Sequence, residues 1–94
     1  MSHVDSRVGI AADLFKIHPR DLIGPHKYQF LMLPRFALSK ALRDNGWTFP
    51  AIGRLVNRDH TTVIYQIERA EYYMERDPAY RNKVKQLAER LADD

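Results

Sequence analysis

A run of polar side chains from Arg58 to Thr62 has the types and spacing best suited to recognising another molecule. Asp59 can cap the start of a helix, because its carboxylate accepts hydrogen bonds from the free N–H groups of the first turn. His60 and Thr61 then place an imidazole and a hydroxyl group in that turn. Short polar groups at the tip of a helix, with a guanidinium beside them, can read the edges of base pairs. The run therefore predicts a DNA recognition helix.

Each of these side chains also has a plain structural role. Asp59 would cap the helix whether or not DNA binds, and Thr61 and Thr62 could bond to their own backbone. His60 is poorly suited to a core position at a helix start, and its imidazole can touch a thymine methyl group or a purine edge. Singly the residues favour the structural role, but in this order and beside Arg58 they favour contact with DNA.

Catalysis and metal binding are disfavoured. Asp59, His60 and Thr61 have the residue types of a nucleophilic triad, but neighbours on one helix cannot point at one another as a triad requires. The four histidines show no metal-ligand spacing, and the absence of cysteine excludes disulfides, thiolate nucleophiles and cysteine-based zinc sites. We therefore expect no enzymatic activity, no metal, no cofactor and no small-molecule substrate.

Two helices separated by a tight turn would hold the polar tip in place. Thr48 can cap a short helix with Pro50 in its first turn, and Asn57 can end it because asparagine tolerates the left-handed conformation. A longer helix is expected from 59 to about 76, apolar on one side and polar on the other. Its expected buried seam is Val63, Ile67, Ala70 and Met74. This is the helix-turn-helix layout.

The whole chain predicts an all-α domain of about six helices around one core. The expected helix starts, several of them marked by a first-turn proline or a capping side chain, are Ser6, Pro19, Pro34, Thr48, Asp59 and Asp77. Gly24 and Asn45-Gly46 are stop signals. The expected core positions of the third and last helices are Ala37, Leu38, Ala41, Leu42, Tyr80, Val84, Leu87 and Leu91.

The loop over residues 24–33 is the least regular stretch. Gly24-Pro25 forbids helix at its start, and Lys27 gives the loop one sure positive charge. Tyr28 and Phe30 could either anchor the loop in the core or contact a partner. We favour anchoring, because aromatic burial dominates small cores.

Size and composition predict a single folded domain. The chain has 94 residues, of which 45% are hydrophobic and 29% charged, so we expect one domain over 1–94 that folds on its own. Its core should span about 8–91, with a flexible arm over 1–6. No apolar run approaches a membrane span and the N-terminus lacks a signal-peptide pattern, so a soluble cytoplasmic protein without membrane contact is expected.

Positive charge is concentrated in the middle of the chain. Residues 16–69 contain nine Lys and Arg against four Asp and Glu, whereas the two ends together contain six against eight. A localised positive field attracts phosphate better than a diffuse one. On charge alone, a phosphate-binding surface and an ordinary solvated surface are about equally supported.

Several of these segments resemble the C-terminal DNA-binding domain of DnaA, the bacterial replication initiator. The most specific segments are Ile52-Gly53 and the run over 58–63, Arg-Asp-His-Thr-Thr-Val. Residues 12–23 resemble the first helix of that family and its Asp-Leu-Leu/Ile turn, and Pro34-Arg35 resembles its Pro-Arg after a basic loop. The similarity covers roughly residues 8–91.

The resemblance implies a helical fold of the DnaA domain IV or Trp-repressor type that binds double-stranded DNA. In the family, the Asp-His-Thr segment meets base edges in the major groove and a basic loop residue enters the minor groove. The implied base contacts here are Asp59, His60, Thr61, Thr62 and Lys27. The resemblance implies phosphate contacts from Arg35 and Arg69, and our DNA-binding hypothesis adds phosphate contacts from Arg54 and Arg58. No glycine-rich phosphate loop is present, so nucleotide binding is not implied.

Two departures from the family pattern bear on DNA affinity. The loop is much less basic than the arginine-rich family version, and Lys27 replaces the arginine that a minor groove favours. Val56-Asn57 also replaces a common Gly-Gly.

Our first hypothesis is a sequence-specific reader of DnaA-box-like sites in replication or transcription control, at the nucleoid, which competes or interacts with the initiator. The alternative is a protein-interaction adaptor that kept the fold without specific DNA reading.

Overall fold

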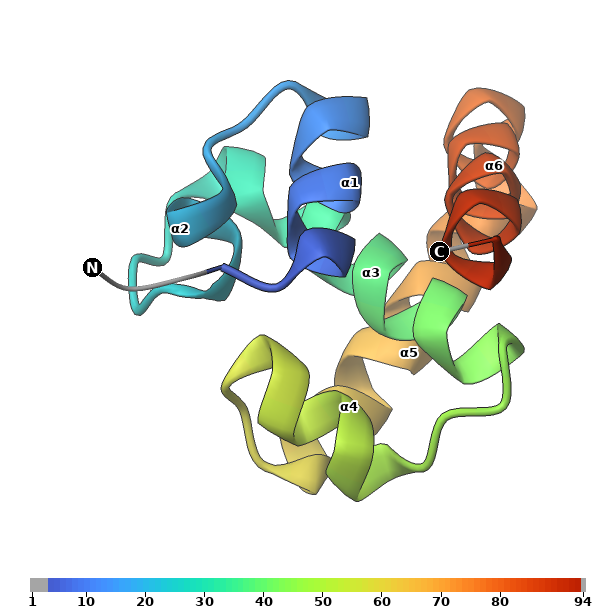
Figure 1. Ribbon diagram of the computed structural model, residues 1–94. Coiled ribbons are helices and arrows are strands. Elements are labelled where there is room, and N and C mark those ends of the chain that lie inside the picture. Colours follow the sequence, from blue (N-terminus) through green and yellow to red (C-terminus); the bar gives the residue numbers. More distant parts are fainter. Residues whose placement is uncertain (1–3, 94) are drawn as a thin grey trace.

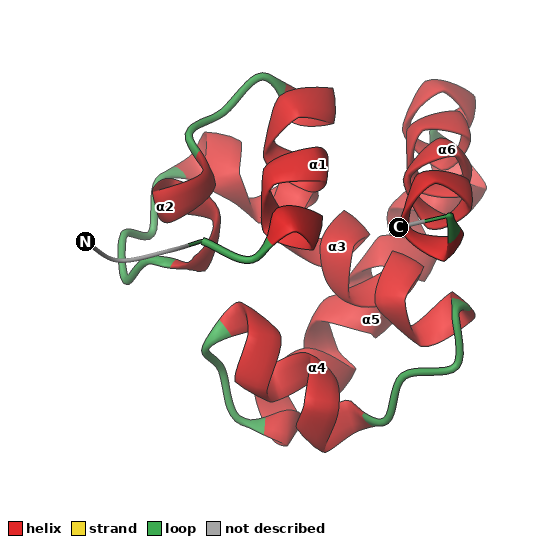
Figure 2. Ribbon diagram, in the orientation of Figure 1, coloured by secondary structure: helices red, strands yellow, loops and turns green. Residues whose placement is uncertain are grey.

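The computed structural model describes residues 4–93, and this part of the chain is entirely helical apart from its connections (Figures 1 and 2). The elements are α1 (Ser6–Phe15), α2 (Pro19–Ile23), the 3-10 turn η1 (Gln29–Leu31), α3 (Met32–Asp44), α4 (Phe49–Val56), α5 (His60–Arg76) and α6 (Pro78–Ala92). The predicted all-α fold of about six helices is therefore confirmed. None of the helices in the described residues is long and apolar enough to span a membrane.

The central element is α3, which packs against each of the other five α-helices (Figure 1). Its predicted buried stripe is confirmed, because Ala37, Leu38, Ala41 and Leu42 are all at most 1% exposed. In α5 the predicted seam is buried except for Met74, which is partly buried and packs against the core. The predicted stripe of α6 is also buried, so this helix closes the core.

Capping side chains fix the starts of α1, α4 and α6 where the sequence predicts these helices to begin. Thr48 accepts a hydrogen bond from the backbone N–H of Ala51 at 3.2 Å, and Asp77 accepts from the first turn of α6. Asp5 caps α1 in the same way, and Ser6 is already helical. The predicted flexible arm over 1–6 is thus ordered from Asp5, and its first three residues lie outside the described part of the chain.

Two predictions about the loop and α3 are wrong. Helix α3 begins at Met32, two residues before Pro34, which stays within the first turn where its missing N–H is tolerated. Tyr28 and Phe30 do not anchor the loop, since they are 54% and 58% exposed. Leu31 takes the core position instead and is fully buried.

A buried side-chain hydrogen bond joins the central helix α3 to α5. The Ser39 hydroxyl donates to the Gln66 side-chain oxygen at 2.6 Å, and both residues are buried. Gln66 lies outside the predicted apolar seam of α5, and the fold buries it beside Ser39.

Candidate nucleic-acid interface

Helices α4 and α5 form a helix-turn-helix around a very tight turn. Asn57 takes the left-handed conformation with φ 61°, as expected, and the Arg58 N–H donates to the Gly53 carbonyl at 2.9 Å. A Cβ atom on Gly53 would lie 2.5 Å from the Arg58 carbonyl oxygen. Glycine is therefore required at position 53, because any side chain would push the turn away from α4.

The polar tip of α5 is held rigidly and faces solvent. The Asp59 carboxylate accepts a hydrogen bond from the Thr62 N–H at 2.9 Å, which lowers the pKa of Asp59 and keeps it ionised. Asp59, His60 and Thr61 are exposed, and Thr62 is half-buried. Val63, directly below them, is fully buried and fixes the helix against the core. Three of the four predicted base-contact residues of this tip are thus exposed, and Thr62 lies half-buried beside them.

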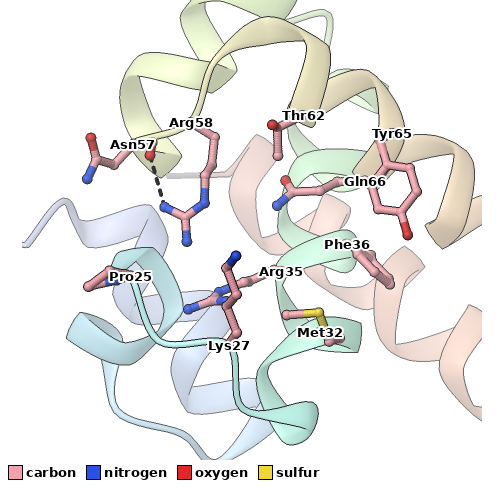
Figure 3. Close-up of a pocket in the computed structure, with 10 residues that line it drawn as sticks. All are labelled: Pro25, Lys27, Met32, Arg35, Phe36, Asn57, Arg58, Thr62, Tyr65 and Gln66. Carbon is pink, nitrogen blue, oxygen red and sulfur yellow. Dashed lines mark hydrogen bonds between the residues drawn. The ribbon is translucent and has the colours of Figure 1, made fainter.

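A hollow of about 690 Å³ separates the tip from the loop that follows α2 (Figure 3). Its wall is formed by the loop, by the start of α3 and by the helix-turn-helix, through Pro25, Lys27, Met32, Arg35, Phe36, Asn57, Arg58, Thr62, Tyr65 and Gln66. Lys27 rises from the loop toward Arg58 (Figure 3). The predicted minor-groove residue and the recognition helix therefore border the same hollow.

The half-buried side chain of Arg58 binds backbone carbonyls. Its Nη1 donates to the Asn57 carbonyl at 2.9 Å (Figure 3) and to the Ile23 carbonyl at 3.3 Å, and its Nη2 donates to the Gly24 carbonyl at 2.6 Å. These bonds tie the helix-turn-helix to the end of α2. The phosphate contact predicted for Arg58 assumed a free guanidinium, which this half-buried side chain does not present.

Arg35 is more deeply enclosed. It is 6% exposed, with Nε donating to the Leu22 carbonyl at 2.9 Å and Nη2 to the Asp21 and Gly24 carbonyls at 2.8 and 3.0 Å. Burial, and then the nearby charge of Arg58, lower the pKa of Arg35 from its usual value. Burial and inward hydrogen bonds give Arg35 a structural role, and the predicted phosphate contact stays a prediction.

The remaining predicted cations occupy different places. Arg54 is exposed and borders a shallow depression together with Asp59 and His60, beside the tip. Arg69 lies further along α5, where its Nη2 donates to the Tyr73 hydroxyl at 3.0 Å and its guanidinium lies 4.6 Å from the centre of the Tyr72 ring. The structure thus gathers Arg54 and Lys27 near the tip and places Arg69 among tyrosines.

No group of three or more metal-ligating side chains occurs among the described residues. The exposed groups at the tip are hydrogen-bond donors and acceptors of short reach, on a helix whose other side is buried. This combination defines a helix-turn-helix that can present a helix end to a groove of DNA.

The chain belongs to the DnaA family of helix-turn-helix domains, as its resemblance indicated. The family described as "Bacterial dnaA protein helix-turn-helix" matches residues 8–70, which include most of α1, all of α2 to α4 and most of α5. Matched to this family, the chain places Asp59, His60 and Thr61 at the start of the second helix of the motif.

Two of the curated relatives of this chain are both named chromosomal replication initiator protein DnaA. The chromosomal replication initiator protein DnaA of Thermomicrobium roseum is 33% identical over 82 residues, which cover 85% of this chain and 18% of that protein. The protein of that name from Acinetobacter baylyi is 31% identical over 80 residues, covering 83% of this chain and 17% of that protein. This chain spans less than a fifth of the length of these relatives.

Sequence reasoning missed the structural roles of Arg35 and Arg58. The carbonyl partners of Arg35 lie 11 to 14 residues earlier in the chain, and the two partners of Arg58 at the end of α2 lie 34 and 35 residues earlier. No local pattern reports contacts at these separations. One available signal was the short helix that ends just before Gly24, because its terminal carbonyls must find donors from elsewhere.

Proposed function

We propose that this protein binds double-stranded DNA sequence-specifically through its helix-turn-helix. The observation that supports this most is the exposed tip at Asp59, His60 and Thr61, capped, rigid and uncovered by the rest of the described chain. Membership of the DnaA helix-turn-helix family supports the same function. The sites bound would resemble DnaA boxes.

Each exposed residue has a role in this proposal. Asp59, His60, Thr61 and Thr62 contact base edges in the major groove, where a carboxylate accepts from a cytosine amino group and an imidazole meets a thymine methyl group or a purine. Lys27 contacts the minor groove. These five residues supply the sequence-reading surface.

Phosphate contacts come from the cations that remain free. Arg54 beside the tip is the first of them, and Arg69 contributes if its guanidinium leaves the tyrosines. Arg35 and Arg58 act indirectly, by shaping the backbone that carries the contacts. Phosphate contacts position the protein, whereas base contacts select the sequence.

A regulatory role follows from such binding. A reader of DnaA-box-like sites in the cytoplasm, at the nucleoid, would compete with or assist the replication initiator, in replication or transcription control. The relatives are named replication initiators, which supports replication as the first process to examine.

The deciding experiment is a selection of tight binders from random duplexes, followed by salt titration of the selected duplex. We expect affinity to fall steeply with salt, with a slope of about −0.9 per phosphate contact, because binding releases counterions. A scrambled duplex of equal length is the control. Failure to bind the selected duplex at low salt, or equal affinity for both duplexes, would refute specific reading.

A protein-interaction adaptor is the alternative, and one observation favours it. Tyr28 and Phe30 are exposed on the loop, and their rings stack on each other with centroids 5.7 Å apart. Exposed aromatic groups often mark partner surfaces. Absence of DNA binding at low salt, together with an intact fold, would favour this function.

A further inference from the structure

The C-terminus of α2 is held by arginine side chains from two other elements. A helix leaves its last carbonyl groups without intrahelical partners, and these need donors from elsewhere. Gly24 has φ −82° and ψ 179°, so the chain leaves α2 extended, with no left-handed cap to bond the carbonyls. Four consecutive carbonyls, those of residues 21–24, accept hydrogen bonds from Arg35 or Arg58 instead. We call this arrangement the α2 clamp.

The two arginines meet at one carbonyl oxygen. Nη2 of Arg35 lies 3.0 Å and Nη2 of Arg58 lies 2.6 Å from the Gly24 oxygen. Arg35 comes from α3, the central helix, whereas Arg58 comes from the turn of the helix-turn-helix. Two like charges are kept close because the helix end supplies a concentration of partial negative charge. The clamp therefore joins three elements at a single point.

The clamp also lies between the two segments that the proposed function assigns to DNA. Lys27 follows Gly24 by three residues, a length of chain that reaches at most about 10 Å. On the other side, Arg58 directly precedes Asp59, the cap of the recognition helix. Fixing the Gly24 carbonyl to the Arg58 guanidinium thus limits how far the Lys27 loop can move relative to the tip.

We infer that Arg58 is a positioning residue that sets the spacing between the Lys27 loop and the recognition helix, through its bonds to the Ile23 and Gly24 carbonyls. This inference rests on the proposed function for its consequence: the two segments read DNA in one fixed register. The mechanical part, the coupling of loop and helix in the free protein, does not depend on DNA.

An arginine is required for this role. Its planar fork carries five N–H donors, which allow Arg58 to reach the carbonyls of Ile23, Gly24 and Asn57 together. Lysine would preserve the charge but offers a compact ammonium group without that fixed geometry. Arg58→Lys therefore separates the bridging role from the charge.

The first test measures the coupling without DNA. The chain has no cysteine, so His26→Cys in the loop and Glu68→Cys on α5 provide two unique positions for spin labels. Pulsed electron paramagnetic resonance should give a narrow distance distribution for the otherwise unchanged chain and a clearly broader one with Arg58→Met or Arg58→Lys. Arg54→Met, a change of a neighbouring exposed arginine, is the matched control and should stay narrow. An unchanged narrow distribution in both Arg58 variants would overturn the coupling.

Circular dichroism and thermal unfolding of every variant accompany this test, and distances are measured well below each melting temperature. If Arg58→Met does not fold, Arg58→Lys carries the test, because it keeps the charge and most of the side-chain volume. A narrow distribution in folded Arg58→Lys then overturns the inference.

The second test measures register on DNA. A selected duplex is compared with one that has a single base pair inserted between the minor-groove and major-groove contacts, located by footprinting. We expect the insertion to weaken parent binding roughly tenfold, as a mismatch does. In Arg58→Lys the ratio of the two affinities should move toward unity. An unchanged ratio would overturn the role in register. If the parent protein binds no duplex at all while the spin-label result holds, the proposed function fails and the coupling stands.

Discussion

His60 is an exposed side chain in the first turn of α5, with no role in the core. His60→Ala should therefore leave the free energy of unfolding within about 0.5 kcal/mol of the parent. The ratio of affinities for cognate and scrambled duplexes should fall roughly tenfold, because a base contact is lost. Fluorescence anisotropy on both duplexes measures this ratio. Gln86→Ala, on the exposed side of α6, is the control, and an unaltered ratio in His60→Ala would contradict the assignment.

Arg35 requires a different expectation from an exposed cation. Arg35→Ala removes donors from three backbone carbonyls, so the free energy of unfolding should fall by about 2 kcal/mol or more. A phosphate contact would instead reduce DNA affinity with little change in stability. Urea unfolding distinguishes the two, with exposed Arg54→Ala for comparison. A stable Arg35→Ala variant with weakened DNA binding would restore the phosphate role.

At the scale of elements, the geometry of the helix-turn-helix depends on Gly53. Gly53→Ala would place a methyl group 2.5 Å from the Arg58 carbonyl oxygen. Such overpacking costs about 1–3 kcal/mol, which lowers the melting temperature by at least about 4 °C in a domain of this size. Gly9→Ala is the matched control, because nothing lies within 4 Å of its Cβ position and alanine favours the helix. Calorimetry should show a lowered melting temperature for Gly53→Ala and a raised one for Gly9→Ala. Equal melting temperatures of the two variants would contradict the tight turn.

Local signals explain why most elements could be predicted from sequence. Caps such as Thr48 and Asp59, together with apolar periodicity, act within a few residues and give the helix limits directly. The start of α3 was missed because η1 leads into it before Pro34. Leu31 competes with Tyr28 for the core, and only the assembled fold decides that competition in favour of Leu31.

The candidate site also contains one part that the sequence predicts and one part that only the fold reveals. The exposed tip is one continuous run of residues that the sequence shows directly. The α2 clamp could be recognised only in the folded structure, because Arg58 and its partner Gly24 are 34 residues apart in the sequence. Arginines look alike in a sequence whether they face solvent or carbonyls, so the sequence alone did not reveal that Arg35 and Arg58 bind backbone carbonyls.

At the scale of the whole molecule, α6 completes the core although this helix lies outside the family match. The match ends at residue 70, yet Val84, Leu87 and Leu91 are at most 6% exposed. Tyr80 is buried as well, and its hydroxyl donates to the Leu33 carbonyl at 2.7 Å. We therefore expect the smallest folding unit to contain α6.

A chain ending at Asp77 should lose cooperative unfolding, because the apolar faces of α1, α3 and α5 would be exposed to water. Thermal unfolding followed by circular dichroism measures this, with removal of only residues 93 and 94 as the control. A sharp transition in the chain ending at Asp77 would show that α6 is dispensable.

The ring stack on the loop has a spectroscopic consequence. His26 and Tyr28 stack with centroids 5.2 Å apart, and Phe30 continues the column outside the core. Protons of one ring lie in the magnetic shielding of the next, so their resonances should move upfield relative to free amino acids. The chemical shifts of these ring protons would therefore report how well the loop is ordered. They can be followed by nuclear magnetic resonance in one sample while duplex is added.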